Sequence, residues 1–128
     1  MDAEGPGGAV REFLSTLSQG PLSSPARLAI MLILLLRGQA TFSEIREVLG
    51  LTPGNLGAHL DRLEREGYVK RFRCLRGLRY VTCYRPTAKG AESVGRILRS
   101  ASELWRRLER LDGGSEVRSR ATPSGSAL

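Results

Sequence analysis

The feature that most constrains the fold is a pair of helical segments separated by only three residues. Residues 41–44, Thr-Phe-Ser-Glu, have the pattern of a capping box that opens a helix over 42–49. Gly50 ends that helix, and Thr52 with Pro53 opens a second one that continues to Gly67. Apolar residues recur at helical spacing in both and are expected to face the interior: Ile45, Val48 and Leu49, then Leu56, Leu60 and Leu63. Two helices joined by so short a turn predict a helix-turn-helix.

Two further helices are expected before this pair. Val10, Phe13, Leu14 and Leu17 recur at helical spacing and predict a short first helix that ends near Gly20. Ser24 followed by Pro25 has the pattern of an N-cap and a first-turn proline, and opens a helix that ends at Gly38. Its apolar run, residues 28–36, predicts a buried central helix. A membrane span needs about 20 such residues, so an integral membrane protein is excluded.

Beyond Gly67 the pattern changes to strands and then to one long helix. Residues 68–74 and 80–85 are rich in β-branched and aromatic side chains and predict a β-hairpin with a basic tip. A last helix is expected over residues 88–111, with a heptad seam of Gly90, Val94, Ile97, Ala101, Leu104, Leu108 and Leu111. The sequence predicts a mainly α chain with a small β-hairpin (α+β): one domain over residues 9–112, between disordered ends at 1–8 and 113–128.

Four short motifs, in this order, resemble those of winged-helix DNA-binding regulators of the MarR and ArsR type. They are Pro-x-Arg-x-x-Ile at 25–30, the segment 52–60 with its His-Leu pair, Leu-x-x-x-Gly-Tyr-Val at 63–69, and Thr-x-x-Gly at 87–90. The resemblance implies a winged helix-turn-helix with a long C-terminal dimerisation helix. It also implies a transcription regulator that is not an enzyme.

The charge of the chain is concentrated in the predicted hairpin. Residues 69–86 contain six basic residues and no acidic residue. Outside this segment 14 basic residues stand against 13 acidic ones, so most of the net charge of +7 lies in the hairpin. Eighteen of the 20 basic residues are arginine, whose guanidinium suits phosphates and base edges. A directed positive field of this kind suits a polyanion, and we expect the partner to be double-stranded DNA.

The expected DNA contacts come from the second helix of the helix-turn-helix and from the hairpin. The N-terminus of a helix can seat a phosphate, Asn55 could pair with adenine, and Arg62 with guanine or a phosphate. The tip of the hairpin could enter a minor groove or hold the backbone. The residues expected to contact DNA are Thr52, Pro53, Gly54, Asn55, Gly57, Ala58, His59, Arg62, Arg71, Arg73, Arg76 and Arg79.

The heptad seam of the last helix predicts a homodimer. A helix of 24 residues is about 36 Å long, which exceeds what a domain of this size can cover. A two-fold dimer would bury the seam best. The expected interface residues are Phe13, Leu17, Val94, Ile97, Ala101, Leu104, Trp105, Leu108 and Leu111.

Two interpretations of Cys74 and Cys83 remain open. They lie on the two strands of the hairpin, so they could form a redox switch, but we favour two small apolar side chains in a reducing compartment. His59 is the only histidine, so we expect no metal site, no cofactor and no catalytic His–nucleophile pair.

The expected function is a homodimeric, sequence-specific transcriptional regulator, cytoplasmic and associated with the nucleoid, with no membrane partner. The sequence says nothing about a small-molecule effector. The small side chains of Gly57 and Ala58 keep open an architectural chromatin protein with little sequence preference. A winged helix that binds an acidic protein is a third interpretation.

Overall fold

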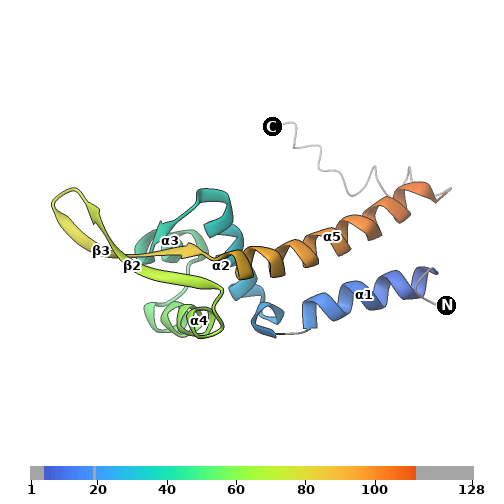
Figure 1. Cartoon of the computed structure of the whole chain (residues 1–128), viewed down its shortest axis with the longest axis horizontal. Helices are drawn as coiled ribbons and strands as arrows, with labels where there is room; N and C mark the ends of the chain where they lie inside the picture. Colours follow the sequence, from blue (N-terminus) through green and yellow to red (C-terminus); the bar gives the residue numbers. More distant parts are fainter. Residues whose placement is uncertain (1–4, 19, 112–128) are drawn as a thin grey trace. The chain divides into compact units, whose positions relative to one another are not determined.

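The structure is a computed structural model that describes residues 5–18 and 20–111 (Figure 1). The described residues form two units: residues 17–96 without residue 19, and residues 5–16 with 97–111. Residues 1–4 and 112–128 lie outside the description, and with them most of the predicted disorder. The elements, in chain order, are α1 (Pro6–Ser18), η2 (a 3-10 turn, Gly20–Ser23), α2 (Pro25–Arg37), β1 (Ala40–Thr41), α3 (Phe42–Leu49), α4 (Pro53–Arg65), β2 (Val69–Arg76), β3 (Arg79–Pro86) and α5 (Ala88–Arg110). Helix α1 starts within the predicted N-terminal tail, because Pro6 to Gly8 are helical.

The helix-turn-helix and the central helix form the core of the unit of residues 17–96. The predicted caps are present: Ser24, Thr41 and Thr52 each accept a hydrogen bond from the backbone N–H three residues later. The side chains that form the core are Ile30, Met31 and Leu34 of α2, Ile45 of α3, and Leu56, Leu60 and Leu63 of α4. Two predictions were wrong in detail. Val48 is 54% exposed, and Leu36 is 87% exposed at the end of α2.

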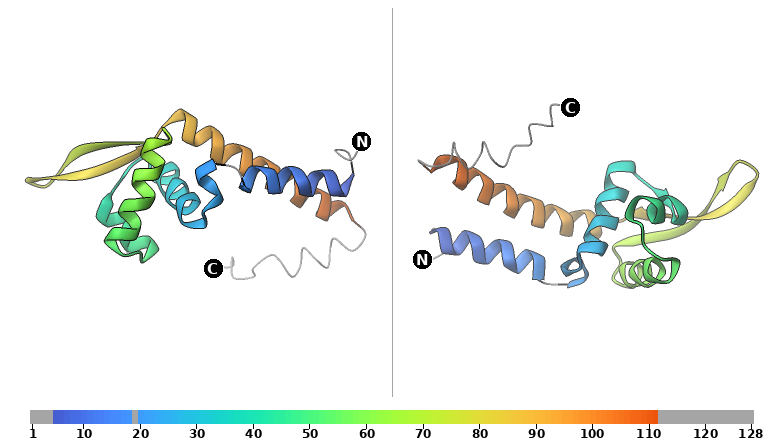
Figure 2. Two further views of the ribbon diagram at one scale, coloured as in Figure 1. Left: turned by 90° about the horizontal axis from the view of Figure 1, so that it is seen from below. Right: turned by 180° about the vertical axis from the view of Figure 1, so that it is seen from behind.

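The sheet of this unit has three antiparallel strands in the order β1-β3-β2. The short strand β1 was not predicted; it pairs with the base of β3 through Ala40↔Tyr84 and Thr41↔Cys83. Strands β2 and β3 pair from Val69↔Pro86 to Arg76↔Arg79, so they are longer than predicted. Gly77, with φ of 64°, begins the two-residue turn, as in the hairpin turn that takes glycine first. The hairpin therefore extends well beyond the helices of its own unit (Figure 2).

The Thr-x-x-Gly motif joins the end of the sheet to α5. The Thr87 hydroxyl donates to the Gly67 carbonyl at 2.6 Å and accepts from the Gly90 N–H at 3.1 Å, so Thr87 caps α5. At Gly90 a Cβ would lie 2.5 Å from the Tyr68 carbonyl oxygen and 2.7 Å from the Met31 side chain. Glycine is therefore required because Tyr68 and Met31 lie too close for a side chain. Its backbone φ is not positive and would allow any residue.

The second unit contains only two helical stretches among its described residues: α1 up to Thr16 and α5 from Ile97. Several of its large apolar side chains are exposed: Val10, Leu14, Leu98, Leu108 and Leu111. The charged side of α5 has Glu103 within 4 Å of Arg106, Arg107 and Arg110. Hydrogen bonds from Arg106 lower the pKa of Glu103. No helix of the described chain is long and apolar enough to cross a membrane.

Candidate nucleic-acid interface

Helix α4 presents one face to solvent along its whole length. Its exposed stripe consists of small and charged residues at helical spacing: Gly54, Ala58, Asp61 and Arg65. At its start, Thr52, Pro53 and Asn55 are exposed as well, and the Thr52 hydroxyl caps the Asn55 N–H at 3.1 Å. The helix N-terminus thus faces solvent. Pro53 has no N–H and the Asn55 N–H is bonded to Thr52, so Gly54 supplies the N–H that a phosphate could accept from.

One flank of this stripe faces the start of α2. His59 is half-buried, and its Nδ1 lies 3.2 Å from Nη1 of Arg27. The Nε of Arg27 donates to the Pro21 carbonyl at 2.7 Å, which holds the guanidinium in place. Burial, and then the nearby charge of Arg62, lowers the pKa of Arg27. Arg62 itself pairs with Glu66 at 3.1 Å within the same helix, so any contact with DNA would compete with this ion pair.

The other flank of α4 faces the hairpin. Glu64 of α4 pairs with Arg71 of β2 at 3.5 Å, which links the helix to the strand. Tyr84 lies beside this pair, and its burial raises the pKa of its hydroxyl, while the charge of Arg71 acts in the opposite direction. Arg71 is therefore partly engaged inside the protein and less available to DNA than its position in the sequence suggested.

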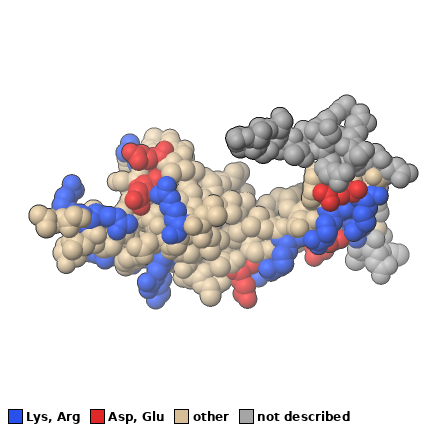
Figure 3. Space-filling view, turned by 90° about the horizontal axis from the view of Figure 1, so that it is seen from above, with Lys and Arg blue, Asp and Glu red and all other residues tan. Residues whose placement is uncertain are grey.

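Basic side chains gather on the face of the hairpin that Figure 3 shows. Arg73 lies over the Tyr80 ring, with its guanidinium carbon 5.9 Å from the ring centre. Arg76 and Arg79 are the last pair before the turn, and both are exposed. Leu78, between them in the turn, is 100% exposed. The tip therefore combines two guanidinium groups with one uncovered apolar side chain.

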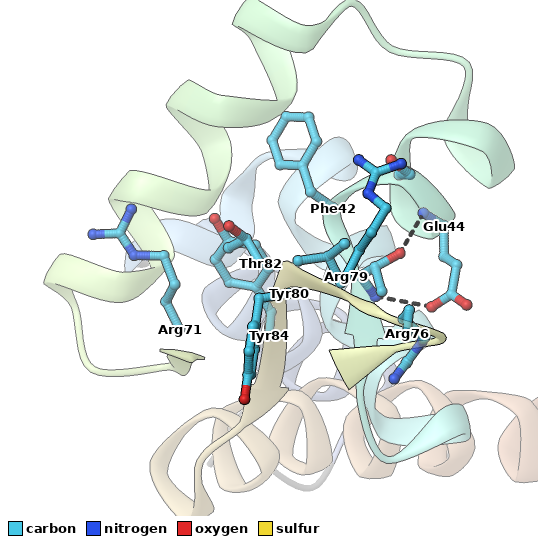
Figure 4. A pocket seen from close by; sticks show the side chains of 11 residues that line it. Phe42, Glu44, Arg71, Arg76, Arg79, Tyr80, Thr82 and Tyr84 are labelled. Atoms are coloured by element: carbon cyan, nitrogen blue, oxygen red, sulfur yellow. Dashed lines mark hydrogen bonds between the residues drawn. The ribbon is translucent and has the colours of Figure 1, made fainter. Parts of the chain in front are cut away.

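A groove of about 570 Å³ lies between the start of α3 and strand β3. In Figure 4, Arg71 lies on one side of the groove, Arg76 and Arg79 on the other, with Tyr80, Thr82 and Tyr84 between them. The acid in its lining is Glu44, whose carboxylate accepts from the Thr41 N–H at 2.8 Å. That hydrogen bond lowers the pKa of Glu44 more than any other interaction. The groove extends the basic surface from the hairpin to the first helix of the helix-turn-helix.

The profile of the winged helix DNA-binding domain family matches residues 26–104, which include the helix-turn-helix, the hairpin and most of α5. The chain belongs to the winged-helix DNA-binding family. The predicted family and fold class are thereby confirmed, and we now call the hairpin the wing and α4 the recognition helix. The family and fold are those of DNA-binding transcription regulators, which are not enzymes.

Solved winged-helix structures are similar over most of the chain. A transcriptional regulator homologue from Pyrococcus horikoshii is 38% identical, with a TM-score of 0.67 over 77% of this chain and 98% of that one. The YusO protein from Bacillus subtilis is 21% identical, with a TM-score of 0.69 over 88% and 79%. A mutant of MarR from Escherichia coli, solved with operator DNA, is 20% identical, with a TM-score of 0.58 over 90% and 84%. No curated protein sequence matches the chain.

The two cysteines of the wing are joined. Cys74 and Cys83 form a disulfide between β2 and β3, with their Cα atoms 6.0 Å apart. The sequence had left the pairing of these cysteines open. We favoured two separate thiols, and that interpretation was wrong. Within the described chain, no three His, Cys, Asp or Glu side chains lie together as metal ligands would.

The predicted dimer residues fall into two groups, those that are buried within the single chain and those that are not. Val94 and Ile97 are already buried in the single chain, at 1% and 4% exposure. They are therefore not available to a partner. The other predicted residues retain exposed surface: Phe13, Leu17, Ala101, Leu104, Trp105, Leu108 and Leu111.

Sequence reasoning missed three residues of the winged helix that lie at its surface near the candidate interface. Arg27 was noted only as part of a motif, because contact with a histidine 32 residues away has no sequence pattern. Arg65 follows Asp61 by one helical turn, and this spacing could have placed it on the exposed stripe. Leu78 could have been noticed as an apolar residue in a two-residue turn.

Proposed function

We propose that the chain is a homodimeric, sequence-specific DNA-binding transcriptional regulator. The observation that carries the proposal is the position of the recognition helix, whose exposed face lies between arginines on both flanks. Arg27 and Arg62 lie on the flank toward α2, and Arg71 lies on the flank toward the wing. An α-helix fits the major groove of B-DNA, and its two flanks then face the two phosphate backbones.

In this proposal the start of the recognition helix contacts DNA first. Gly54 is exposed and supplies the backbone N–H of this first turn, and the side-chain amide of Asn55 is exposed and suited to adenine. Gly57 and Ala58 lack long side chains, so the backbone of the helix can approach the bases closely. The MarR mutant solved with operator DNA supports this use of the fold by its likeness.

The tip of the wing is proposed to enter the minor groove, while the wing arginines neutralise the phosphates that border this groove. Arg73, Arg76 and Arg79 supply the positive charge, but the tip itself is Leu78. An apolar side chain gains nothing from a phosphate, whereas apolar wedges between base steps are common among minor-groove proteins. Arginine is likewise attracted to a narrow minor groove.

The proposed dimer forms through the unit of residues 5–16 and 97–111. A hollow of about 500 Å³ in this unit is lined by Val10, Leu104, Leu108 and Leu111 together with Arg107 and Arg110. Exposed apolar surface of this extent on two helices favours burial by a second copy. Phe13, Ala101 and Trp105 of this unit retain exposed surface, as does Leu17, the first residue of the other unit, and these four are the further proposed contacts.

A dimer would place two recognition helices in successive major grooves, so that regulation follows from blocking or recruiting the transcription machinery. This role implies a cytoplasmic, nucleoid-associated protein with no cofactor and no chemistry of its own. No residue pattern on the described chain requires a small-molecule effector.

A second candidate function is an architectural DNA-binding protein with little sequence preference. One observation favours it: the exposed stripe of the recognition helix contains Gly54 and Ala58 and only two charged residues, Asp61 and Arg65. Few side chains on this stripe can form hydrogen bonds with base edges.

Selection of bound fragments from random duplex separates the two candidates. The full chain is mixed with a random-sequence library, bound DNA is amplified over several rounds, and the enriched site is compared with random duplex in one salt buffer. A regulator should prefer its site by at least about 10³-fold. A smaller ratio favours the architectural protein, and failure to bind any duplex at low salt contradicts both.

The wing is tested by replacing Arg76 and Arg79 with alanine. Binding to every duplex should weaken, and the slope of log K against log salt should flatten by about 0.9 for each phosphate that a wing no longer neutralises. Arg37→Ala with Arg99→Ala removes the same charge from exposed positions outside the wing and is the control. An unchanged slope in the wing variant alone would remove the wing from the DNA-binding surface.

A further inference from the structure

Two of the sequence motifs meet in space although 32 residues separate them. Arg27, from the Pro-x-Arg motif that opens α2, places its Nη1 3.2 Å from Nδ1 of His59, from the His-Leu pair of α4. The second bond of Arg27, from Nε to the Pro21 carbonyl at 2.7 Å, holds the guanidinium at the end of α2. Neither of these two partners is an anion, so the charge of Arg27 is not neutralised by them.

The direction of the Arg27–His59 bond defines the state of the histidine ring. A guanidinium has only donors, so Nδ1 of His59 must accept with its lone pair. The ring proton of the neutral imidazole is then on Nε2, the nitrogen on the opposite side of the ring. His59 is thus an N–H donor whose orientation is determined by a residue of another helix.

The neighbouring residues of α4 add further positive character. Asn55, His59 and Arg62 follow one another at spacings of four and three, so they lie on one flank of the helix. Arg62 is close enough to Arg27 to lower its pKa, although burial has the larger effect. Glu66, which pairs with Arg62 at 3.1 Å, brings a negative charge into this group. Two guanidinium groups and an imidazole N–H gathered around one exposed flank form a site for an anion.

We infer that this flank binds one phosphate of the DNA backbone and that Arg27 is its positioning residue. Arg27 holds the ring so that the Nε2–H of His59 donates to a phosphate oxygen, and Arg62 donates to a second oxygen. The inference rests on the proposed DNA-binding function, and it extends that function to α2, an element outside the helix-turn-helix.

The ring state can be measured without DNA, because His59 is the only histidine of the chain. A long-range ¹H–¹⁵N correlation spectrum of the uniformly labelled full chain distinguishes the two neutral tautomers. We expect the Nε2–H form in the natural chain and a mixture of forms in Arg27→Met. A natural chain with the proton on Nδ1, or identical spectra in the two proteins, would overturn the inference.

Binding to a mixed-sequence duplex at low salt tests the phosphate contact. Asparagine keeps an acceptor near Nδ1 but has no group at Nε2, whereas glutamine reaches the position of Nε2 with a donor. His59→Asn and Arg27→Met should each weaken binding about tenfold, and His59→Gln by less than about threefold, because only a charge-assisted bond is at stake. The neutral imidazole neutralises no phosphate, so the salt slope should stay nearly unchanged in His59→Asn although binding weakens. Arg37→Met, which removes the same charge from the other end of α2, is the control and should change neither quantity beyond the effect of removing one distant charge.

A double variant separates positioning from direct binding. If Arg27 acts through His59, Arg27→Met in the His59→Asn background should cost nothing further. A further tenfold weakening would mean that Arg27 binds DNA by itself and would overturn its role as a positioning residue. Thermal melting checks that each variant folds. Should Arg27→Met melt early because it lacks the hydrogen bond to Pro21, the comparison of His59→Asn with His59→Gln still decides: equal binding by the two contradicts the inference.

The outcomes also separate this inference from the function on which it rests. A natural chain that binds no duplex contradicts the DNA-binding function itself. A natural chain that binds duplex while all of these variants bind equally well leaves that function standing and removes the phosphate site at His59.

Discussion

The two units of this chain differ in how far each can bury its own apolar side chains. In residues 17–96 a set of large side chains from α2, α3 and α4 is completely buried: Ile30, Met31, Leu34, Ile45, Leu56, Leu60 and Leu63. In the other unit, Leu14 and Leu98 remain about half exposed, at 54% and 49%, and Leu111 is 61% exposed. The first unit has a complete hydrophobic core, whereas the helices of the second unit leave large apolar side chains exposed to solvent.

This difference indicates that the two proposed functions, DNA binding and dimerisation, make different demands on the sequence. A DNA-reading unit must hold its recognition helix and wing in fixed positions, so its interior has to be complete within one chain. A dimerising unit has to leave apolar surface exposed, because that surface is completed by the second copy. Variants in the two units should therefore fail in different ways.

The largest effect is expected from Leu104→Glu in the second unit. By two-fold symmetry each dimer would contain two buried carboxylates, so we expect association to weaken by about 4 kcal/mol, or about a thousandfold. Sedimentation should show monomers, and operator binding should fall. Leu36→Glu places the same charge on an exposed leucine of the first unit and should remain dimeric. A Leu104→Glu protein that still sediments as a dimer would contradict the proposal that the second unit forms the dimer interface.

The next largest effect is expected from Gly90→Ala in the first unit. The added Cβ would lie 2.5 Å from the Tyr68 carbonyl oxygen, so the free energy of unfolding should fall by about 3 kcal/mol, as for overpacked cores. Gly57→Ala is the matched control, because nothing lies within 4 Å of its Cβ and alanine favours a helix by about 1 kcal/mol. Chemical denaturation should give opposite signs for the two. A neutral Gly90→Ala would mean that α5 does not approach Tyr68 so closely.

A smaller effect is expected at the wing, the part of the first unit that extends beyond the core. A dithiol reductant converts Cys74 and Cys83 to thiols and is itself oxidised to a disulfide. This reaction removes the covalent link between the two strands. We expect the wing to lose up to about 2.5 kcal/mol of stabilisation, and duplex binding to weaken as the tip gains freedom. Hydrogen exchange of the β2 and β3 amides with and without reductant measures the first effect.

The double variant Cys74→Ser/Cys83→Ser is the control, because reductant should leave its exchange and its DNA affinity unchanged. If the natural chain exchanges and binds equally in both conditions, the disulfide has no role in holding the wing. The expected weakening of duplex binding on reduction would then be wrong.

Much of the first unit could be predicted from local sequence, because its elements begin and end at residues with local effects. Ser24, Thr41 and Thr52 cap their helices through hydrogen bonds that span three residues, and Gly38 and Gly50 end two of them. The strand β1 could not be predicted. It has only two residues, too few to show an alternation of apolar and polar side chains, and its partner strand β3 lies more than 40 positions later in the sequence. Val48 has helical spacing but lies on the exposed side of α3, since one helical turn cannot show which of its flanks meets the core.

The sequence by itself determined the order of the elements, the caps that limit them, and the concentration of positive charge in the wing, since all of these depend on neighbouring residues. Only the tertiary structure decided which distant groups meet: Arg27 with His59, Glu64 with Arg71, Cys74 with Cys83, and Gly90 with Tyr68. It also decided that Val94 is core while Leu108 is surface, although both belong to one heptad seam. The physical reason is that a periodic pattern records which side of a helix is apolar, whereas burial depends on what the rest of the chain places against that side.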